Sequence, residues 1–212
     1  MIKLLVVDEH PIVRKGLELV FGVSQDIKYM GSVGDGEAIF DFIKNTPVDV
    51  IVTEIDLPKL NGITALRRLK KEFPKTKVII YSGQPEYVYA VSAIKAGAAG
   101  YVPKTADILT LKEAIVKVTN GDVYLSHELT QRLALGNKAN KTSPFYKKLS
   151  TREVEVLKLL SSGKRNKEIA EELNINEKTV STYRARLMKK LNVTNLVDLV
   201  NQANQLELQD AI

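Results

Sequence analysis

Blocks of apolar residues alternate with mixed blocks along the first part of the chain, and each pair matches a strand followed by a helix. Short runs rich in apolar residues lie at residues 2–7, 27–33, 48–52, 77–81 and 100–102. Helical spacing of apolar residues follows at residues 11–22, 39–43, 63–73, 85–95 and 107–119. Strict alternation predicts parallel strands, right-handed crossovers and helices on both faces of the sheet. The economical topology is a flavodoxin-like, doubly wound α/β domain with a five-stranded parallel sheet in the order 2-1-3-4-5.

Toward the C-terminus the pattern becomes purely helical. Ser150 followed by Glu153 is a capping-box signature, and Gly163 ends the helix that it opens. A short helix at 166–173, a turn at 174–176, a longer helix at 177–191 and a last helix capped by Asn195 follow. A short helix, a tight turn and a second helix are typical of a helix-turn-helix domain, whose second helix enters the major groove of DNA. The sequence therefore predicts an all-α helix-turn-helix domain at this end.

The residues between these two patterns are predicted to form a linker. Ser126 caps a short predicted helix with Leu129, Leu133 and Leu135 on one face. Residues 136–144 have almost no apolar content, which is typical of an exposed, flexible tether. The predicted organisation is an α/β domain at residues 1–122, a linker at 123–146 and a helical domain at 147–212.

Composition narrows the classes of function. The chain of 212 residues has no Cys, which excludes a disulfide framework and a thiolate metal site, and its two His argue against a histidine-rich one. The apolar run at the N-terminus is too short for a secretory signal. No run approaches the roughly 20 apolar residues that a membrane span needs. We therefore expect a cytoplasmic protein with no membrane partner.

Polar and charged side chains follow four of the predicted strands. Asp8 and Glu9, then Glu54, Ser82 and Lys104, fall just past strand ends, at the rim where open parallel sheets bind ligands. Neighbouring carboxylates raise one another's pKa unless a cation neutralises them, and their hard oxygens suit Mg²⁺. The candidate metal ligands are Asp8, Glu9, Glu54 and Asp56. Because a lysine and a hydroxyl can contact further phosphoryl oxygens, the rim predicts a Mg²⁺ and phosphoryl site. A solvated, charged rim is the alternative.

A family resemblance rests on four segments, which are Asp8-Glu9, DVIVTEIDLPKLNG at 49–62, Ser82-Gly83 and Gly100-Tyr101-Val102-Pro103-Lys104. Together they resemble the receiver domain of bacterial two-component response regulators over residues 1 to about 122. The resemblance implies Mg²⁺ at the paired acids, Ser82 and Lys104 as phosphoryl contacts, and Tyr101 as the aromatic residue that reports the change. It also implies a sensor histidine kinase as a partner.

One position departs from the family pattern. The phosphate-accepting aspartate of the family stands four residues before the proline, and here Glu54 holds that place before Pro58. The extra methylene carries the carboxylate outward by about one C–C bond, and a displacement of about 1 Å can cost a reaction about a hundredfold. We therefore expect a receiver that is phosphate-independent or permanently biased by Glu54. In the alternative, phosphorylation proceeds normally, with Glu54 as a slow acceptor or Asp56 as a substitute.

The basic residues are concentrated in the predicted helix-turn-helix domain. Residues 147–192 contain twelve Lys and Arg against six Asp and Glu, a net charge of +6. Contacts to DNA phosphates need such an excess. A solvated helical face is the alternative interpretation.

The segments LSTREVEVL at 149–157, NKEIA at 166–170 and EKTV at 177–180 closely resemble the LuxR-type DNA-binding domain over about residues 147–206. Phosphate contacts are implied at Lys167, Lys178 and Thr179, base-facing positions at Ser181, Thr182 and Ala185, flanking positions at Arg184 and Arg186, and a further exposed position at Lys189. The last helix, with Val197 and Val200, lies where this family dimerises on DNA. Small base-facing residues favour methyl or water-mediated contacts over bidentate ones.

The two resemblances together predict a DNA-binding transcription regulator of the NarL/FixJ class that is not an enzyme. We expect it to bind a pseudo-palindromic promoter site as a homodimer. A doubly wound enzyme is one alternative, but no Gly-x-Gly-x-x-Gly follows the first strand, and the chain has no P-loop and no nucleophile elbow. An interaction module whose receiver only dimerises is another. Loss of DNA binding on Lys178→Ala and Arg186→Ala would separate the regulator from the module.

Overall fold

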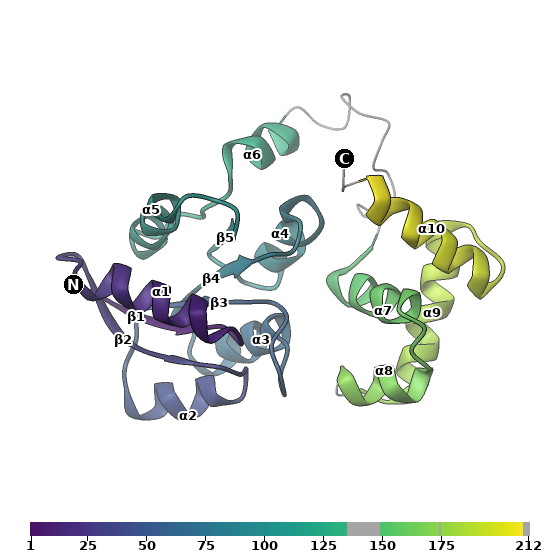
Figure 1. Cartoon of the computed structure of the whole chain (residues 1–212), viewed down its shortest axis with the longest axis horizontal. Helices are drawn as coiled ribbons and strands as arrows, with labels where there is room; N and C mark the ends of the chain where they lie inside the picture. The colour runs from purple at the N-terminus through teal and green to yellow at the C-terminus, as the bar shows by residue number, and fades with distance from the viewer. Residues whose placement is uncertain (135–148, 174, 210–212) are drawn as a thin grey trace. The chain divides into compact units, whose positions relative to one another are not determined.

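The computed structural model of the chain describes residues 1–134, 149–173 and 175–209 (Figure 1). It divides into two compact units, Met1–Lys138 and Ala139–Ile212. The predicted tether at 136–144, Leu135 of the predicted linker helix, and Asn174 of the predicted turn lie outside the described residues. The first unit extends beyond the boundary predicted at Asp122 and includes the short helix that follows it.

The first unit is built on a parallel sheet. Its strands are β1 (Ile2–Val7), β2 (Ile27–Val33), β3 (Val50–Thr53), β4 (Lys77–Ser82) and β5 (Gly100–Pro103). They follow the order β2-β1-β3-β4-β5, which confirms the predicted topology. The central strands β1 and β3 are buried because helices cover both faces, so nearly every residue in them is apolar. The regular ladder of β3 starts at Val50, later than predicted, and at the residue before it the Asp49 carboxylate accepts from the Lys3 N–H (2.8 Å).

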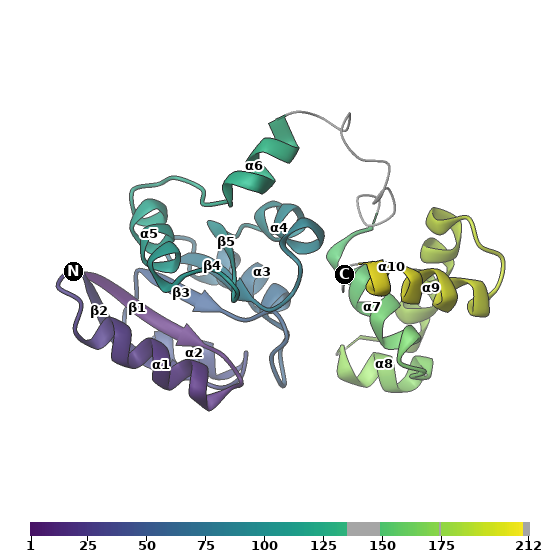
Figure 2. The same cartoon turned by 45° about the horizontal axis from the view of Figure 1, so that its top comes forward.

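Five helices cover the two faces of this sheet (Figures 1 and 2). They are α1 (Pro11–Gly22), α2 (Ala38–Asn45), α3 (Gly62–Glu72), α4 (Glu86–Lys95) and α5 (Ile108–Thr119). Buried side chains of α1 and α5 share one apolar cluster with β1, β3, β4 and β5, so both helices lie on the same face. Right-handed crossovers then put α2, α3 and α4 on the other face. All carboxyl ends of the strands consequently meet at one rim.

The loop after β3 is held tightly against the strand end. The Gly62 N–H donates to the Ile55 carbonyl (2.8 Å), and a Cβ at Gly62 would stand 2.0 Å from the Glu54 carbonyl oxygen. A Cβ at Gly36 would likewise stand 1.8 Å from the Leu60 carbonyl oxygen. Only glycine allows these close backbone approaches. The loop therefore fixes the direction in which Glu54 leaves the strand.

A short segment after α5 returns along β5. The Tyr101 N–H donates to the Tyr124 carbonyl (3.0 Å), and the Tyr124 N–H donates to the Ala99 carbonyl (2.9 Å). The helix α6 (His127–Ala134) then begins, and its Leu129 is buried. The predicted linker helix exists, and the segment just before it is hydrogen-bonded to the sheet edge.

The second unit contains four helices in its described part. They are α7 (Thr151–Ser161), α8 (Asn166–Glu172), α9 (Glu177–Leu191) and α10 (Leu196–Gln209). The predicted capping box is present, since the Ser150 N–H donates to the Glu153 carboxylate (2.6 Å). Lys190 also reaches Glu153 (2.7 Å), and this contact joins α9 to α7. Although burial alone would raise it, the Lys190 ammonium and the Ser150 donors hold the pKa of Glu153 below its usual range.

Candidate functional site

The rim of the sheet gathers side chains from four strand ends. Asp8 follows β1, Glu54 follows β3, Ser82 ends β4 and Lys104 follows β5. Asp8, Glu54 and Ser82 are buried, with relative exposures of 1, 6 and 0%. The structure thus brings together these four residues, which the strand-end argument selected from the sequence.

Lys104 lies between two carboxylates. Its Nζ is 2.6 Å from Asp8 Oδ2 and 2.8 Å from Glu54 Oε2. Burial opposes the charge of the ammonium, but the hydrogen bonds to the two carboxylates outweigh it and raise the pKa of Lys104 above its usual value. The lysine therefore neutralises the repulsion between Asp8 and Glu54 that would otherwise need a metal cation.

The Glu54 carboxylate accepts hydrogen bonds at both oxygens. Oε1 accepts from the Ser82 hydroxyl and from the Ile55 N–H (2.5 Å). Oε2 accepts from the Gly83 N–H (3.3 Å) in addition to the Lys104 ammonium. A hydroxyl, a backbone amide and an ammonium are the donors that phosphoryl oxygens would use at such a rim. In this structure the glutamate carboxylate engages all three.

Tyr101 is linked to the same cluster through the loop between β4 and α4. Its side chain is fully buried, and its hydroxyl donates to the Gln84 carbonyl (2.7 Å). Burial raises the pKa of this phenol well above its usual range, so it acts as a neutral donor. The Gln84 N–H in turn donates to Ser82 Oγ (3.1 Å). A hydrogen-bonded path therefore runs from Tyr101 through Gln84 and Ser82 to Glu54.

The other two predicted metal ligands do not join this cluster. Glu9 is exposed, and its carboxylate lies 4.0 Å from the exposed imidazole of His10. Asp56 is also exposed and accepts from the side-chain amide of Gln84 (2.5 Å). Within the described residues, no group of three or more His, Cys, Asp or Glu is placed to hold a metal. As arranged here, with the Lys104 ammonium between Asp8 and Glu54, the donors do not fit a Mg²⁺ site, and Mg²⁺ binding stays a prediction.

The helix α9 presents a polar, basic face to solvent. Its exposed residues include Lys178, Ser181, Thr182, Ala185, Arg186 and Lys189, whereas Thr179 and Arg184 are half-buried. Lys167 is exposed on α8. The apolar residues of α9, Val180, Leu187 and Leu191, are buried, so the helix is amphipathic as predicted. The predicted DNA-facing residues thus lie on the solvent side or at its edge.

Two hydroxyls on this face are tied to the helix backbone. Ser181 Oγ donates to the Glu177 carbonyl (3.1 Å) and Thr182 Oγ1 donates to the Lys178 carbonyl (2.9 Å). Ser181 Oγ also accepts from the side-chain amide of Asn166 at the start of α8 (3.2 Å). Since a hydroxyl has one proton to donate, both residues offer oxygen lone pairs outward.

Each of the two units matches a known protein family. Residues 4–116 match the response regulator receiver domain, and residues 147–203 match the bacterial regulatory proteins of the luxR family. The chain is also 33% identical over 204 residues to the Fimbriae Z protein of Salmonella typhimurium, covering 96% of this chain and 97% of that protein. The chain belongs to the response regulators with a LuxR-type helix-turn-helix.

Other relatives of this response regulator are of the same class. Response regulator UvrY of Escherichia coli is 31% identical, covering 96% of this chain and 94% of that protein. A structure of RcsB from Salmonella enterica serovar Typhimurium, bound to a promoter in the presence of the phosphomimetic BeF3-, matches with a TM-score of 0.75 and 25% identity. It covers 94% of this chain and 96% of that one. The family consists of DNA-binding transcription regulators of the NarL/FixJ class and not of enzymes, which removes the doubly wound enzyme as an alternative.

The predicted dimerisation helix of this response regulator is α10. Val197 is 68% exposed, and Val200 is half-buried. Leu199 and Ala203 face the core of their own unit and are buried. The helix therefore has an inward apolar side and, at Val197, an outward apolar residue.

Some residues of the site belong to no sequence pattern that would have predicted their role. Arg14 donates to the carbonyls of Asp8 (2.6 Å) and Glu9 (3.0 Å) and so fixes the loop after β1. Gln84 joins Ser82, Tyr101 and Asp56 through its backbone and its side chain. Only the position of Gln84, two residues after Ser82, could have suggested it.

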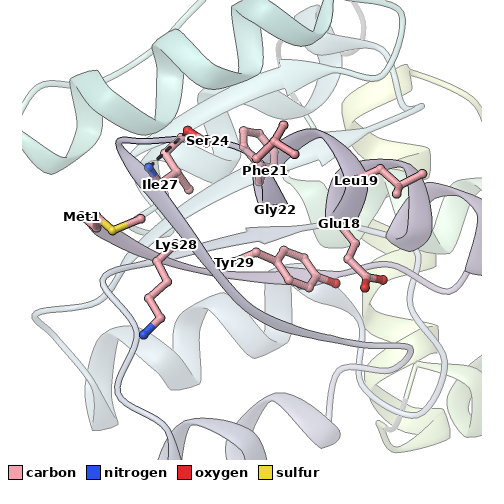
Figure 3. A pocket seen from close by; sticks show the side chains of 10 residues that line it. Met1, Glu18, Leu19, Phe21, Gly22, Ser24, Ile27, Lys28 and Tyr29 are labelled. Atoms are coloured by element: carbon pink, nitrogen blue, oxygen red, sulfur yellow. Dashed lines mark hydrogen bonds between the residues drawn. The ribbon is translucent and has the colours of Figure 1, made fainter.

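A shallow hollow of about 350 Å³ lies near the amino ends of β1 and β2, at the opposite end of the sheet from the rim that carries Asp8 and Glu54 (Figure 3). Met1 precedes β1, Ile27 opens β2, and Phe21 and Leu19 come from the end of α1. None of the predicted site residues lines it.

Among the described residues, no helix is long and apolar enough to cross a membrane.

Proposed function

We propose that this transcription regulator is held in its DNA-binding state by Glu54 and needs no phosphorylation. One observation carries the proposal: the Glu54 carboxylate accepts from the Ser82 hydroxyl, the Gly83 N–H and the Lys104 ammonium. These are the donors that a phosphoryl group on the usual aspartate would engage. The glutamate carries a permanent negative charge to the same place.

The same contacts make Glu54 a poor phosphate acceptor. A carboxylate that attacks phosphorus needs a free oxygen lone pair aligned with the leaving group. Both oxygens of Glu54 accept hydrogen bonds, and the Lys104 ion pair withdraws charge from one of them. Transfer would have to break these contacts first. Asp56 is a weaker substitute, because its carboxylate is exposed and already accepts a hydrogen bond from Gln84.

Mg²⁺ and a sensor histidine kinase belong to the alternative in which Glu54 or Asp56 accepts phosphate. Asp8 and Glu9 are the acids that would hold the metal in that case. Lys104 already neutralises Asp8 and Glu54, so the proposed state does not require the cation. Regulation would then act on the amount of protein rather than on its phosphorylation.

For the second unit we propose binding to a pseudo-palindromic promoter site as a homodimer. Lys167, Lys178 and Thr179 would hold phosphates, and Lys189, Arg184 and Arg186 would lie beside the groove. Ser181, Thr182 and Ala185 would face the bases, and Val197 and Val200 of α10 would contact the second copy. The assignment is supported by the exposure of most of these side chains on α8, α9 and α10, with Thr179, Arg184 and Val200 half-buried.

The hydroxyls on α9 narrow the bases that would be read. Because Ser181 and Thr182 donate to their own helix, their oxygens would accept from the exocyclic amines of adenine or cytosine. The methyl groups of Thr182 and Ala185 suit the thymine methyl. Asn166 would hold Ser181 in this acceptor state through its amide.

Binding of the full-length protein to a duplex selected from a random library tests the receiver proposal. We expect wild-type affinity to be unchanged by acetyl phosphate with Mg²⁺, and Glu54→Ala to weaken binding by at least about tenfold, a coupling of about 1.4 kcal/mol. Glu54→Gln, which keeps the size and removes the charge, should also weaken it. Glu72→Gln, on α3, is the matched control. A large gain in DNA affinity with acetyl phosphate, or a stable phosphoprotein, would contradict the proposal. Mass spectrometry after borohydride reduction would then identify the residue that accepts phosphate.

A further inference from the structure

The segment that leaves α5 is fastened to the sheet before α6 begins. Tyr124 pairs with β5 at two points, through its carbonyl to the Tyr101 N–H (3.0 Å) and through its N–H to the Ala99 carbonyl (2.9 Å). A Cβ at Gly100 would stand 3.0 Å from Tyr124 Cβ, so glycine lets the segment approach this closely. The strand β5, which contains Tyr101, therefore also holds the segment around Tyr124 in place.

Ser126 attaches α6 to the start of α4. Its hydroxyl donates to Glu86 Oε2 (2.6 Å) and its N–H donates to Glu86 Oε1 (3.1 Å). The same hydroxyl accepts from the Leu129 N–H (3.1 Å), and the Leu129 side chain is 5% exposed. Charged hydrogen bonds of this kind are among the stronger ones in proteins. Ser126 thus opens α6 and ties it to Glu86.

Glu86 is the first residue of α4 and lies two residues beyond Gln84, which belongs to the loop hydrogen-bonded to Glu54 through Ser82 and Gly83. The Gln84 N–H donates to Ser82 Oγ (3.1 Å), the Gln84 carbonyl accepts from Tyr101 (2.7 Å), and Ser82 donates to Glu54. The Gly83 N–H also donates to Glu54 (3.3 Å). One short loop therefore joins the Glu54 carboxylate to the residue that fastens α6.

We propose that Glu86 and Ser126 form a latch through which Glu54 controls the docking of α6. While the Glu54 carboxylate holds Ser82 and Gly83, the loop keeps Glu86 in hydrogen-bond contact with Ser126. This contact is the closed state of the latch. Loss of that carboxylate frees the loop, weakens the Glu86 contact and releases α6 from α4. Because α6 is the last described element before the second unit, the latch decides where the connection to the DNA-binding domain leaves the receiver. The inference rests on the proposed role of Glu54.

Hydrogen exchange of the full-length protein, followed by mass spectrometry, tests the latch. We expect amides at 123–134 to exchange roughly three- to tenfold faster in Ser126→Ala and in Glu86→Gln, as the loss of one or two hydrogen bonds implies. Glu86→Gln keeps the size of the side chain but loses one acceptor. Glu72→Gln, on α3, is the matched control and should leave these amides unchanged.

Coupling to Glu54 is tested by a double-variant cycle. Glu54→Ala should speed exchange both at 82–86 and at 123–134, and the Glu54→Ala, Ser126→Ala double variant should exchange at 123–134 no faster than Ser126→Ala alone. Additive effects, or faster exchange at 82–86 with none at 123–134, would overturn the latch. Promoter binding separates this result from the proposed function. A wild type that gains affinity with acetyl phosphate contradicts phosphate independence, and the exchange cycle still decides the latch.

Discussion

Lys104 and Glu54 form an ion pair of 2.8 Å at the carboxyl ends of β5 and β3, and the same ammonium reaches Asp8 at 2.6 Å. Removing the lysine leaves two buried carboxylates facing each other without a cation. We expect Lys104→Met to lower the free energy of unfolding by about 3 kcal/mol at neutral pH, near the lower limit for breaking a buried pair. Urea unfolding of wild type and variant measures the difference, with Lys95→Met on α4 as an exposed control.

The pH dependence of this difference has a definite sign. The carboxylates raise the pKa of Lys104 in the folded state above its unfolded value, although burial opposes them. The stabilisation is therefore fully present below the unfolded pKa of about 10.4 and is lost as pH rises through the folded pKa. The difference in free energy of unfolding between wild type and Lys104→Met should therefore narrow above about pH 10.4. A difference that stays the same as pH rises through this range would contradict this account.

Shortening Glu54 by one methylene should return the site to ordinary receiver chemistry. In Glu54→Asp the carboxylate withdraws from the Ser82 hydroxyl and from Lys104, which frees these donors for a phosphoryl group. We expect this variant to bind Mg²⁺ more tightly than wild type and to form a phosphoprotein with acetyl phosphate. Calorimetric Mg²⁺ titration and intact mass measure the two properties. A variant that stays unmodified would mean that the pocket has lost more than the aspartate.

We expect Ser82 and Tyr101 to stabilise the receiver to different extents. Ser82→Ala removes one donor to a buried carboxylate that keeps its bonds to Ile55, Gly83 and Lys104, and a hydrogen bond to a charged group should be worth about 1.5–3 kcal/mol. Tyr101→Phe removes one neutral hydrogen bond to the Gln84 carbonyl and keeps the ring, so we expect a loss of about 1 kcal/mol. Thermal and urea unfolding of both variants would check the order. Equal losses would show that the hydroxyl of Ser82 is not bound to a charged group.

The fold of the receiver follows from local patterns, so the sequence predicted it well. Short runs such as Leu4 to Val7 and Val50 to Val52 are apolar at every position, because both sheet faces are covered. Their alternation with helical periods then leaves few topologies. The strand-end argument also selected Asp8, Glu54, Ser82 and Lys104, since the carboxyl ends of parallel strands share one rim.

Contacts between side chains far apart in the sequence could not be predicted in the same way. Glu86 and Ser126 are each ordinary polar residues at helix starts, and no local pattern pairs them. The same holds for Tyr124, whose partners on β5 are backbone groups. Whether the acids at 8, 9, 54 and 56 converge also depends on the direction of each side chain, and here Glu9 and Asp56 are exposed and lie apart from Asp8 and Glu54. The tether at 136–144 lies outside the described residues and stays a prediction.

DNA recognition by α9 should separate into affinity and base preference. Lys178→Ala removes a proposed phosphate contact, so it should weaken binding to all sequences and reduce the salt dependence by about one ion. Ser181→Ala and Asn166→Ala should instead relax the preference for adenine or cytosine at one position of each half-site, by roughly three- to tenfold for one hydrogen bond. Selection of sites from a random duplex library by each full-length variant measures both effects. Lys95→Ala, in the receiver, is the control for charge. A uniform loss of affinity in Asn166→Ala, with unchanged base preference, would make Asn166 a phosphate contact and remove its role in orienting Ser181.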